Sequence, residues 1–148
     1  MAGRRVVVTG IGTINPLGHS IDEYFDNLEK GVSAARTITH FDASKFRSHI
    51  ACEVKDYDWT KYFDRKEVRK YDRYAQYAMI AVAEAMQDSG LEEAGEEADR
   101  AGVIWSTGVG GLGSFFDEVM DYAAGDGTPR FSPFFVPRMI PDLAAGYI

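Results

Sequence analysis

The sequence predicts an α/β fold with a mostly parallel sheet, and three observations support this. An apolar run, Val6-Val7-Val8, leads into Gly10, and a second run, Val103-Ile104-Trp105, leads into a glycine-rich turn. Short continuous apolar runs of this kind are typical of strands covered on both faces. Helix-like segments lie between the two runs and after the second. The resulting alternation of strands and helices favours a parallel sheet.

A turn and a capped helix follow the first run. The turn is predicted at residues 15–18, Asn-Pro-Leu-Gly. Ser20 and Glu23 have the spacing of a capping box, and Gly31 marks the end of the helix. The helix has one apolar stripe, formed by Ile21, Tyr24, Phe25 and Leu28.

The cysteine and the histidines do not suggest a reactive or metal site. Cys52 lies in a short predicted strand, residues 50–54, with no helix start behind it. This context predicts a buried, inert thiol. The three histidines have no ligand spacing, either among themselves or with Cys52: His19, His40 and His49. We therefore expect no metal and no cofactor.

A basic face is predicted after residue 64. Asp64 and Glu67 have the spacing of a helix cap, and Lys66, Arg69 and Lys70 would share one face of the helix that follows. This face can be an ordinary solvated surface or a docking patch for an acidic partner. The residues alone favour the solvated surface.

The remaining helices differ in character. Residues 74–86 are apolar nearly all round and rich in alanine, which predicts a buried helix that ends at Ser89-Gly90. The acidic stretch 92–99 predicts a solvated loop or short helix. Residues 132–137 predict a rigid apolar loop, and residues 139–148 a helix with Pro141 in its first turn. Because that helix stops uncapped, we expect the chain to be the front part of a longer protein.

The glycine-rich turn joins the second apolar run to a predicted helix at residues 114–124. Gly108, Gly110 and Gly113 match the spacing G-x-G-x-x-G of dinucleotide-binding loops. A nucleotide site would also need a following strand that ends in an acidic residue, and the chain instead continues into a Pro-rich stretch. The alternative is that the glycines permit a tight turn and close packing.

Composition excludes several classes of protein. The chain has 148 residues, 45% of them hydrophobic and 26% charged, which is typical of one globular domain. The net charge of −7 excludes a general nucleic-acid binder, although basic residues outnumber acidic ones between Lys45 and Arg73. No apolar run has the length of a membrane span. A single cysteine suits a reducing compartment, so we expect a cytoplasmic protein.

Five segments, in the same order, resemble the front part of the β-ketoacyl-[acyl-carrier-protein] synthases, most closely those of type II. They are VVVTGIGTINPLG, RKEVRKYDRYAQYA, AMQDSGL, STGVGGLG and SPFFVPRMIPDLAAGY. The resemblance covers the whole chain. It implies the N-terminal part of a thiolase-like fold, with αβαβα layers and a mostly parallel mixed sheet, in a homodimeric enzyme that is more than twice as long.

The resemblance implies a condensing enzyme of fatty acid elongation. In that family a cysteine carries the acyl chain, and two histidines assist the decarboxylation of malonyl-carrier. These positions fall beyond Ile148, so residues 1–148 hold no catalytic residue and the piece alone is expected to be inactive. A non-catalytic relative that sets chain length is a second possibility, and a nucleotide-binding α/β domain is a third.

The resemblance also assigns substrate-side residues. It implies that Val109 gates the acyl pocket and that Phe135 lines the pocket of the partner subunit. Val109 is smaller than the isoleucine usual in type II, which implies a different chain-length preference. The positions that bind acyl carrier protein match Lys66, Arg69, Lys70 and Arg130. Phe131 departs from the family, which commonly has a second basic residue there.

Overall fold

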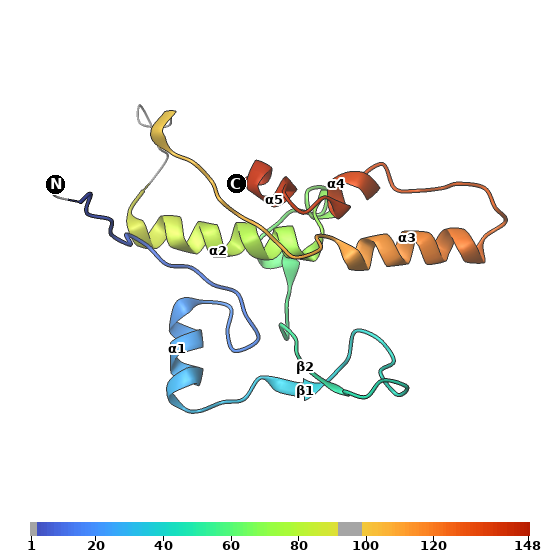
Figure 1. Cartoon of the computed structure of the whole chain (residues 1–148), viewed down its shortest axis with the longest axis horizontal. Helices are drawn as coiled ribbons and strands as arrows, with labels where there is room; N and C mark the ends of the chain where they lie inside the picture. The colour runs from blue at the N-terminus through green and yellow to red at the C-terminus, as the bar shows by residue number, and fades with distance from the viewer. Residues whose placement is uncertain (1–2, 92–98) are drawn as a thin grey trace. The chain divides into compact units, whose positions relative to one another are not determined.

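The computed structural model of the protein describes residues 3–91 and 99–148 (Figure 1). The chain forms two compact units. Unit 1 is Met1–Tyr57 with Ala81–Glu92, and unit 2 is Asp58–Ile80 with Glu93–Ile148. Most of the acidic stretch 92–99 lies outside the described residues. Within the described ranges, no helix is both long and apolar enough to cross a membrane.

Unit 1 contains the first predicted helix. Its elements are α1 (Ile21–Glu29), β1 (Ala35–Thr37), β2 (Ile50–Cys52) and the second half of α2 (Arg73–Ser89). The Ser20 hydroxyl accepts a hydrogen bond from the Glu23 amide at 3.2 Å, which is the predicted N-cap. The prediction of this helix is therefore confirmed at its first turn.

The segment that precedes α1 packs on the backbone of α2. A Cβ atom on Gly10 would lie 2.2 Å from the Ala85 carbonyl oxygen, and one on Gly12 would lie 1.9 Å from that of Ala81. Only glycine permits such an approach. The Glu84 carboxylate, on the same helix, then accepts hydrogen bonds from two backbone amides, that of Thr13 at 2.7 Å and that of Ile21 at 2.8 Å. The Glu84 carboxylate thus satisfies two backbone donors of this segment.

The two strands of the described residues form a small antiparallel pair. Ala35 lies opposite Cys52, and Thr37 opposite Ile50. The prediction that Cys52 is buried is wrong, because its side chain is exposed. A two-stranded sheet leaves one face uncovered unless another element packs on it, and alternate residues such as Ile50 and Cys52 lie on that open face.

Unit 2 is built around the first half of α2. Its other elements are the 3₁₀ turns η1 (Trp59–Lys61) and η2 (Val68–Lys70) and the helices α3 (Leu112–Ala124), α4 (Phe135–Met139) and α5 (Leu143–Tyr147). The core is formed by Tyr71, Ala75, Ala78 and Ala144. The rings of Tyr71 and Tyr147 meet edge to face at 4.6 Å, which fixes α5 against the start of α2.

Neither of the two apolar runs forms a strand in this structure. Val6 is 89% exposed and Ile104 is fully exposed, so the expectation of strands buried on both faces is not met. A strand requires a hydrogen-bonded neighbour at about 4.8 Å. Among residues 3–91 and 99–148, none pairs with either run. The described residues therefore include both α and β elements, and the predicted mostly parallel sheet is not confirmed among them.

The C-terminal helix is divided. The loop predicted at 132–137 ends at Phe134, because α4 begins at Phe135. The helix predicted at 139–148 is present only as α5, which a break at Ile140 separates from α4. Proline disfavours the helical conformation of the residue before it. Ile140 precedes Pro141 and is accordingly extended, with φ −68° and ψ 124°. Pro137 lies in the first turn of α4, where a missing N–H is tolerated.

Candidate functional site

The glycine-rich turn lies directly on the backbone of α4. A Cβ atom on Gly111 would lie 2.1 Å from the Arg138 carbonyl oxygen, and the Gly111 amide donates to the Met139 carbonyl at 3.2 Å. Gly110 has a φ of +77°, a conformation that residues with a side chain rarely adopt. The turn is thus shaped to close against another part of the chain. Close packing accounts for Gly110 and Gly111 without any phosphate.

The two predicted acyl-pocket residues both lie in this part of unit 2. Val109 precedes Gly110 and is 60% exposed, while Phe135 is the first residue of α4 and is half-buried. The helices α3 and α4 contact each other, and Figure 1 shows the long loop that joins them. Val109 lies in the glycine-rich turn, three residues before α3 begins, and Phe135 lies in α4.

Phe135 is the shared member of an aromatic row. Its ring stacks with that of Phe131 at 5.4 Å between centroids and with that of Phe115 at 6.0 Å, with interplanar angles of 15° and 18°. Tyr122 extends the row by contacting Phe131 at 5.4 Å. The row joins α3, the α3–α4 loop and α4 through apolar rings.

Asp72 ties the start of α2 to the start of α3. One carboxylate oxygen accepts from the Tyr74 amide at 3.2 Å, and the other accepts from the hydroxyl of Ser114 at 2.5 Å. Ser114 is 6% exposed, in the first turn of α3. Asp72 follows η2, and Ser114 follows the glycine-rich turn. Their hydrogen bond therefore links the segment of the predicted docking residues to that turn.

The α-helix predicted after residue 64 does not form, and whether Lys66, Arg69 and Lys70 share one face stays a prediction. The Asp64 carboxylate caps the segment by accepting from the Lys66 and Glu67 amides at 2.7 and 2.8 Å. The chain then forms the 3₁₀ turn η2, which ends at Lys70, and the Asp72 carboxylate accepts from the Tyr74 amide at the start of the next helix, α2, which begins at Arg73. Lys66, Arg69 and Lys70 are nevertheless all exposed.

Arg130, the fourth predicted docking residue, lies in the loop between α3 and α4. Its guanidinium is 3.0 Å from the Asp126 carboxylate, and 74% of its side chain is exposed. Hydrogen bonds from Thr128 and then from Arg130 lower the pKa of Asp126. The positive charge of Arg130 is thus partly neutralised within its own loop.

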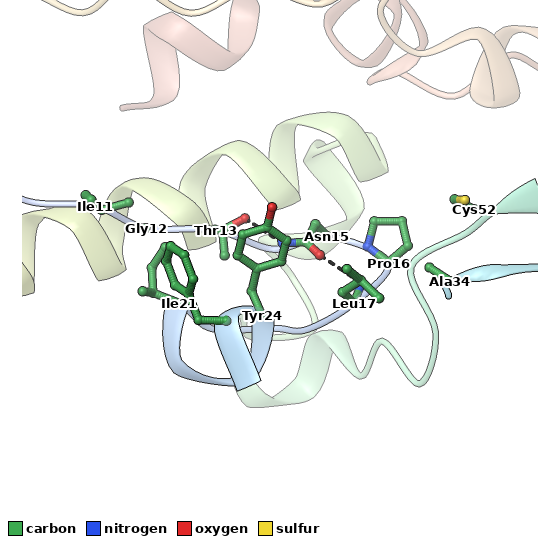
Figure 2. A pocket seen from close by; sticks show the side chains of 11 residues that line it. Ile11, Gly12, Thr13, Asn15, Pro16, Leu17, Ile21, Tyr24, Ala34 and Cys52 are labelled. Atoms are coloured by element: carbon green, nitrogen blue, oxygen red, sulfur yellow. Dashed lines mark hydrogen bonds between the residues drawn. The ribbon is translucent and has the colours of Figure 1, made fainter. Parts of the chain in front are cut away.

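Unit 1 contains an apolar pocket of about 610 Å³ that the sequence did not indicate. Figure 2 shows Tyr24 rising from α1 on one side and Cys52 near Ala34 at the end of the pocket. Two polar side chains of the pocket bind each other, since the Asn15 side-chain amide donates a hydrogen bond to the Thr13 hydroxyl at 3.0 Å. In the described part of the chain, no group of three or more potential metal ligands occurs.

Comparison with known proteins identifies the family. The model of the β-ketoacyl synthase N-terminal domain matches residues 3–148. The chain belongs to the β-ketoacyl synthase family. Its fold agrees with this assignment, because the ishigamide ketosynthase/chain length factor superposes with a TM-score of 0.79 and 30% identity. That comparison covers 99% of this chain and 36% of the other.

Curated β-ketoacyl synthases match over nearly the whole chain. The 3-oxoacyl-[acyl-carrier-protein] synthase 2 of Coxiella burnetii is 39% identical, over 100% of this chain and 36% of its own length. The enzyme of the same name from Staphylococcus aureus strain N315 is 38% identical, over 98% of this chain and 35% of its own length. The chain thus spans about a third of the relatives that it matches.

Two features of the site were missed by sequence reasoning. The aromatic row is not periodic, because Phe115, Phe131 and Phe135 come from three separate segments. The Asp72–Ser114 bond joins residues 42 positions apart. The sequence signal for Asp72 is local: aspartate is favoured at the residue before a helix, and Asp72 precedes α2. This signal does not indicate Ser114 as its partner.

Proposed function

We propose that the protein carrying this chain is a 3-oxoacyl-[acyl-carrier-protein] synthase that elongates fatty acids. The observation that supports this most strongly is the 38–39% identity, over 98–100% of the chain, to enzymes with that name. The chain would form the front part of the N-terminal half of a thiolase-like, layered enzyme. In that assembly the apolar runs at Val6 and Val103 would pair in a mostly parallel sheet.

The reaction would be a decarboxylating Claisen condensation, carried out by residues beyond Ile148. The acyl chain passes from its carrier to a cysteine thiolate as a thioester, and the carrier thiol leaves. Malonyl-carrier then loses CO₂, and its carbanion attacks the thioester carbonyl. A carbon–carbon bond forms, the cysteine thiolate is released, and the product is a 3-oxoacyl-carrier that is two carbons longer.

The contribution of this chain would be to bind the acyl tail. Val109 would gate the pocket, and Phe135 would line it in the partner subunit of a homodimer. Two observations support this role: Val109 is exposed beside a turn held on α4, and Phe135 is held in an apolar row on the same helix. A flexible hydrocarbon needs this kind of apolar wall, and it needs no charged partner.

Lys66, Arg69 and Lys70 would dock the acyl carrier protein, with Arg130 as a fourth contact. Carrier proteins of this kind are acidic, and a local cluster of exposed cations attracts an acidic partner even on a chain with net charge −7. The ion pair of Arg130 with Asp126 makes its contribution the weakest of the four. The expected location of the whole enzyme is the cytoplasm.

The test is an assay of the full-length protein with acyl-carrier and malonyl-carrier, in which products are identified by mass spectrometry. The proposal predicts a 3-oxoacyl product that is two carbons longer and the release of one CO₂ per product. If neither is formed by the folded protein, the proposal fails.

A chain-length partner subunit is the second candidate, because the ishigamide structure that the chain resembles contains a chain length factor. Such a subunit would have another residue in place of the cysteine and would condense nothing by itself. The sequence of the gene after Ile148 separates these two candidates. A shift of the melting temperature with NADH or ATP would instead favour the nucleotide-binding alternative.

A further inference from the structure

We propose that Phe131 determines the acyl-chain-length preference of the synthase by fixing the ring of Phe135. This inference rests on the proposed function, and it adds a positioning residue to it. The resemblance does not supply this residue, because a basic residue is common at position 131 in the family. The stacking geometry of the aromatic row supplies it.

Phe135 is stacked against two rings from different segments. Phe131 approaches from the α3–α4 loop at 5.4 Å, and Phe115 approaches from α3 at 6.0 Å. Both interplanar angles are below 20°, so the three rings lie nearly parallel. Tyr122 contacts Phe131 from the far end of α3, at 5.4 Å and 35°, and so holds Phe131 itself in place.

A stacked pair favours one ring position over the alternatives. Aromatic pairs of this kind stabilise by amounts that correspond to roughly a two- to tenfold preference per pair. Phe135 is only half-buried, so the surrounding backbone alone does not restrict its ring. Its two stacked neighbours therefore account for much of its order.

The position of this ring determines the depth of the pocket. If Phe135 lines the acyl pocket, a fixed ring ends the pocket at one depth, and longer tails are excluded by contact. Loss of the Phe131 ring would let Phe135 turn aside and admit a tail two carbons longer. Discrimination of about tenfold per small apolar group is ordinary for such pockets.

The experiment compares variants of the full-length synthase on a series of saturated acyl-carriers. Phe131→Leu and Phe131→Met remove the ring, Phe131→Tyr keeps it, and Phe116→Leu removes a ring that lies outside the row. The measurement is the ratio of kcat/KM for the preferred chain to that for the chain two carbons longer. We expect the ringless variants to lower this ratio by about three- to tenfold and the other two to preserve it. Melting temperatures confirm that each variant is folded.

The results distinguish this inference from the proposed function. An unchanged ratio in either folded ringless variant overturns the role of Phe131 and leaves the synthase assignment intact. An equal fall of the ratio in Phe116→Leu also overturns it, because the effect would then be general to α3. If the folded wild-type enzyme condenses no acyl-carrier at all, both proposals fail together.

Discussion

At the scale of single residues, contacts with the backbone explain why glycine occupies particular positions. A Cβ atom on Gly12 would meet the carbonyl oxygen of Ala81 at 1.9 Å, and the helix backbone cannot move away without losing its own hydrogen bonds. Gly113 is the second residue of α3, and apart from the helix's own backbone and its chain neighbours no atom lies within 4 Å of its absent side chain. The same substitution, glycine to alanine, can therefore be compared at a crowded position and at an open one.

We predict that Gly12→Ala destabilises the protein by about 2–4 kcal/mol, since overpacking against a backbone atom cannot be relieved by a side-chain rotation. Gly113→Ala should instead stabilise it by about 0.5–1 kcal/mol, because alanine favours the helix. Urea denaturation of both variants measures the difference. Equal stabilities would contradict the close packing of residues 10–13 on α2.

Glu53 provides a second prediction at this scale. Its carboxylate accepts hydrogen bonds from Lys55 Nζ at 2.8 Å and from the Thr39 hydroxyl at 2.7 Å. These bonds lower the pKa of Glu53 to about 2, and the bond from Lys55 has the largest effect. Since the folded pKa lies below the unfolded value, the stabilisation is complete above about pH 4.5 and is lost as the pH falls towards 2.

Glu53→Gln should therefore weaken the decline of stability between about pH 4.5 and 2, as measured by urea denaturation at several pH values. Asp117→Asn is the control, since it removes a carboxylate of α3 and none of these bonds. Parallel stability profiles for the wild type and Glu53→Gln would show that the bonds around Glu53 do not hold in solution.

At the scale of elements, a hydrogen bond joins the start of α2 to the start of α3. Ser114 is 6% exposed and donates to Asp72, so its removal leaves a partly buried carboxylate oxygen without this donor. We predict that Ser114→Ala costs about 1–2 kcal/mol and increases hydrogen exchange over residues 109–116. The exposed Ser106→Ala should change stability by less than about 0.5 kcal/mol. If hydrogen exchange over residues 109–116 is unaltered in Ser114→Ala, the Asp72–Ser114 bond does not hold the start of α3 in place.

Helices were predicted better than strands, for a physical reason. A helix satisfies its own backbone, so that α1 could be predicted from Ser20, and α2 from its apolar run and the stop at Ser89. A strand needs a partner, and the runs at Val6 and Val103 have none among the described residues. Short helices such as α4 depend on packing more than on local signals.

The candidate site was predicted in part for the same reason. The glycine-rich turn and the basic residues are visible as local patterns. The aromatic row and the Asp72–Ser114 bond join distant segments, and no pattern in a single sequence relates Phe115 to Phe131. The exposure of Cys52 was missed because its surroundings depend on what covers the sheet.

At the scale of the whole molecule, the distribution of charge matters more than the net charge for binding an acidic partner. We predict that reversing Arg69 and Lys70 to glutamate in the full-length enzyme weakens carrier binding by about tenfold and reduces its dependence on salt. The same double reversal at Arg4 and Arg5, exposed cations of unit 1, should have little effect. Affinities measured over a range of ionic strengths decide this. An unchanged affinity in the Arg69/Lys70 variant would contradict the docking assignment.

The central claim is that an acyl tail passes the glycine-rich turn at Val109. The most direct measurement is the kcat/KM of the full-length synthase over a series of acyl lengths, with Val109→Phe compared with the matched change Val32→Phe in unit 1. We expect Val109→Phe to reduce the use of the longest accepted chains by about tenfold or more while the shortest are still accepted. Val32→Phe should leave the profile unchanged. If Val109→Phe and the wild type have the same profile, the acyl tail does not pass the glycine-rich turn at Val109.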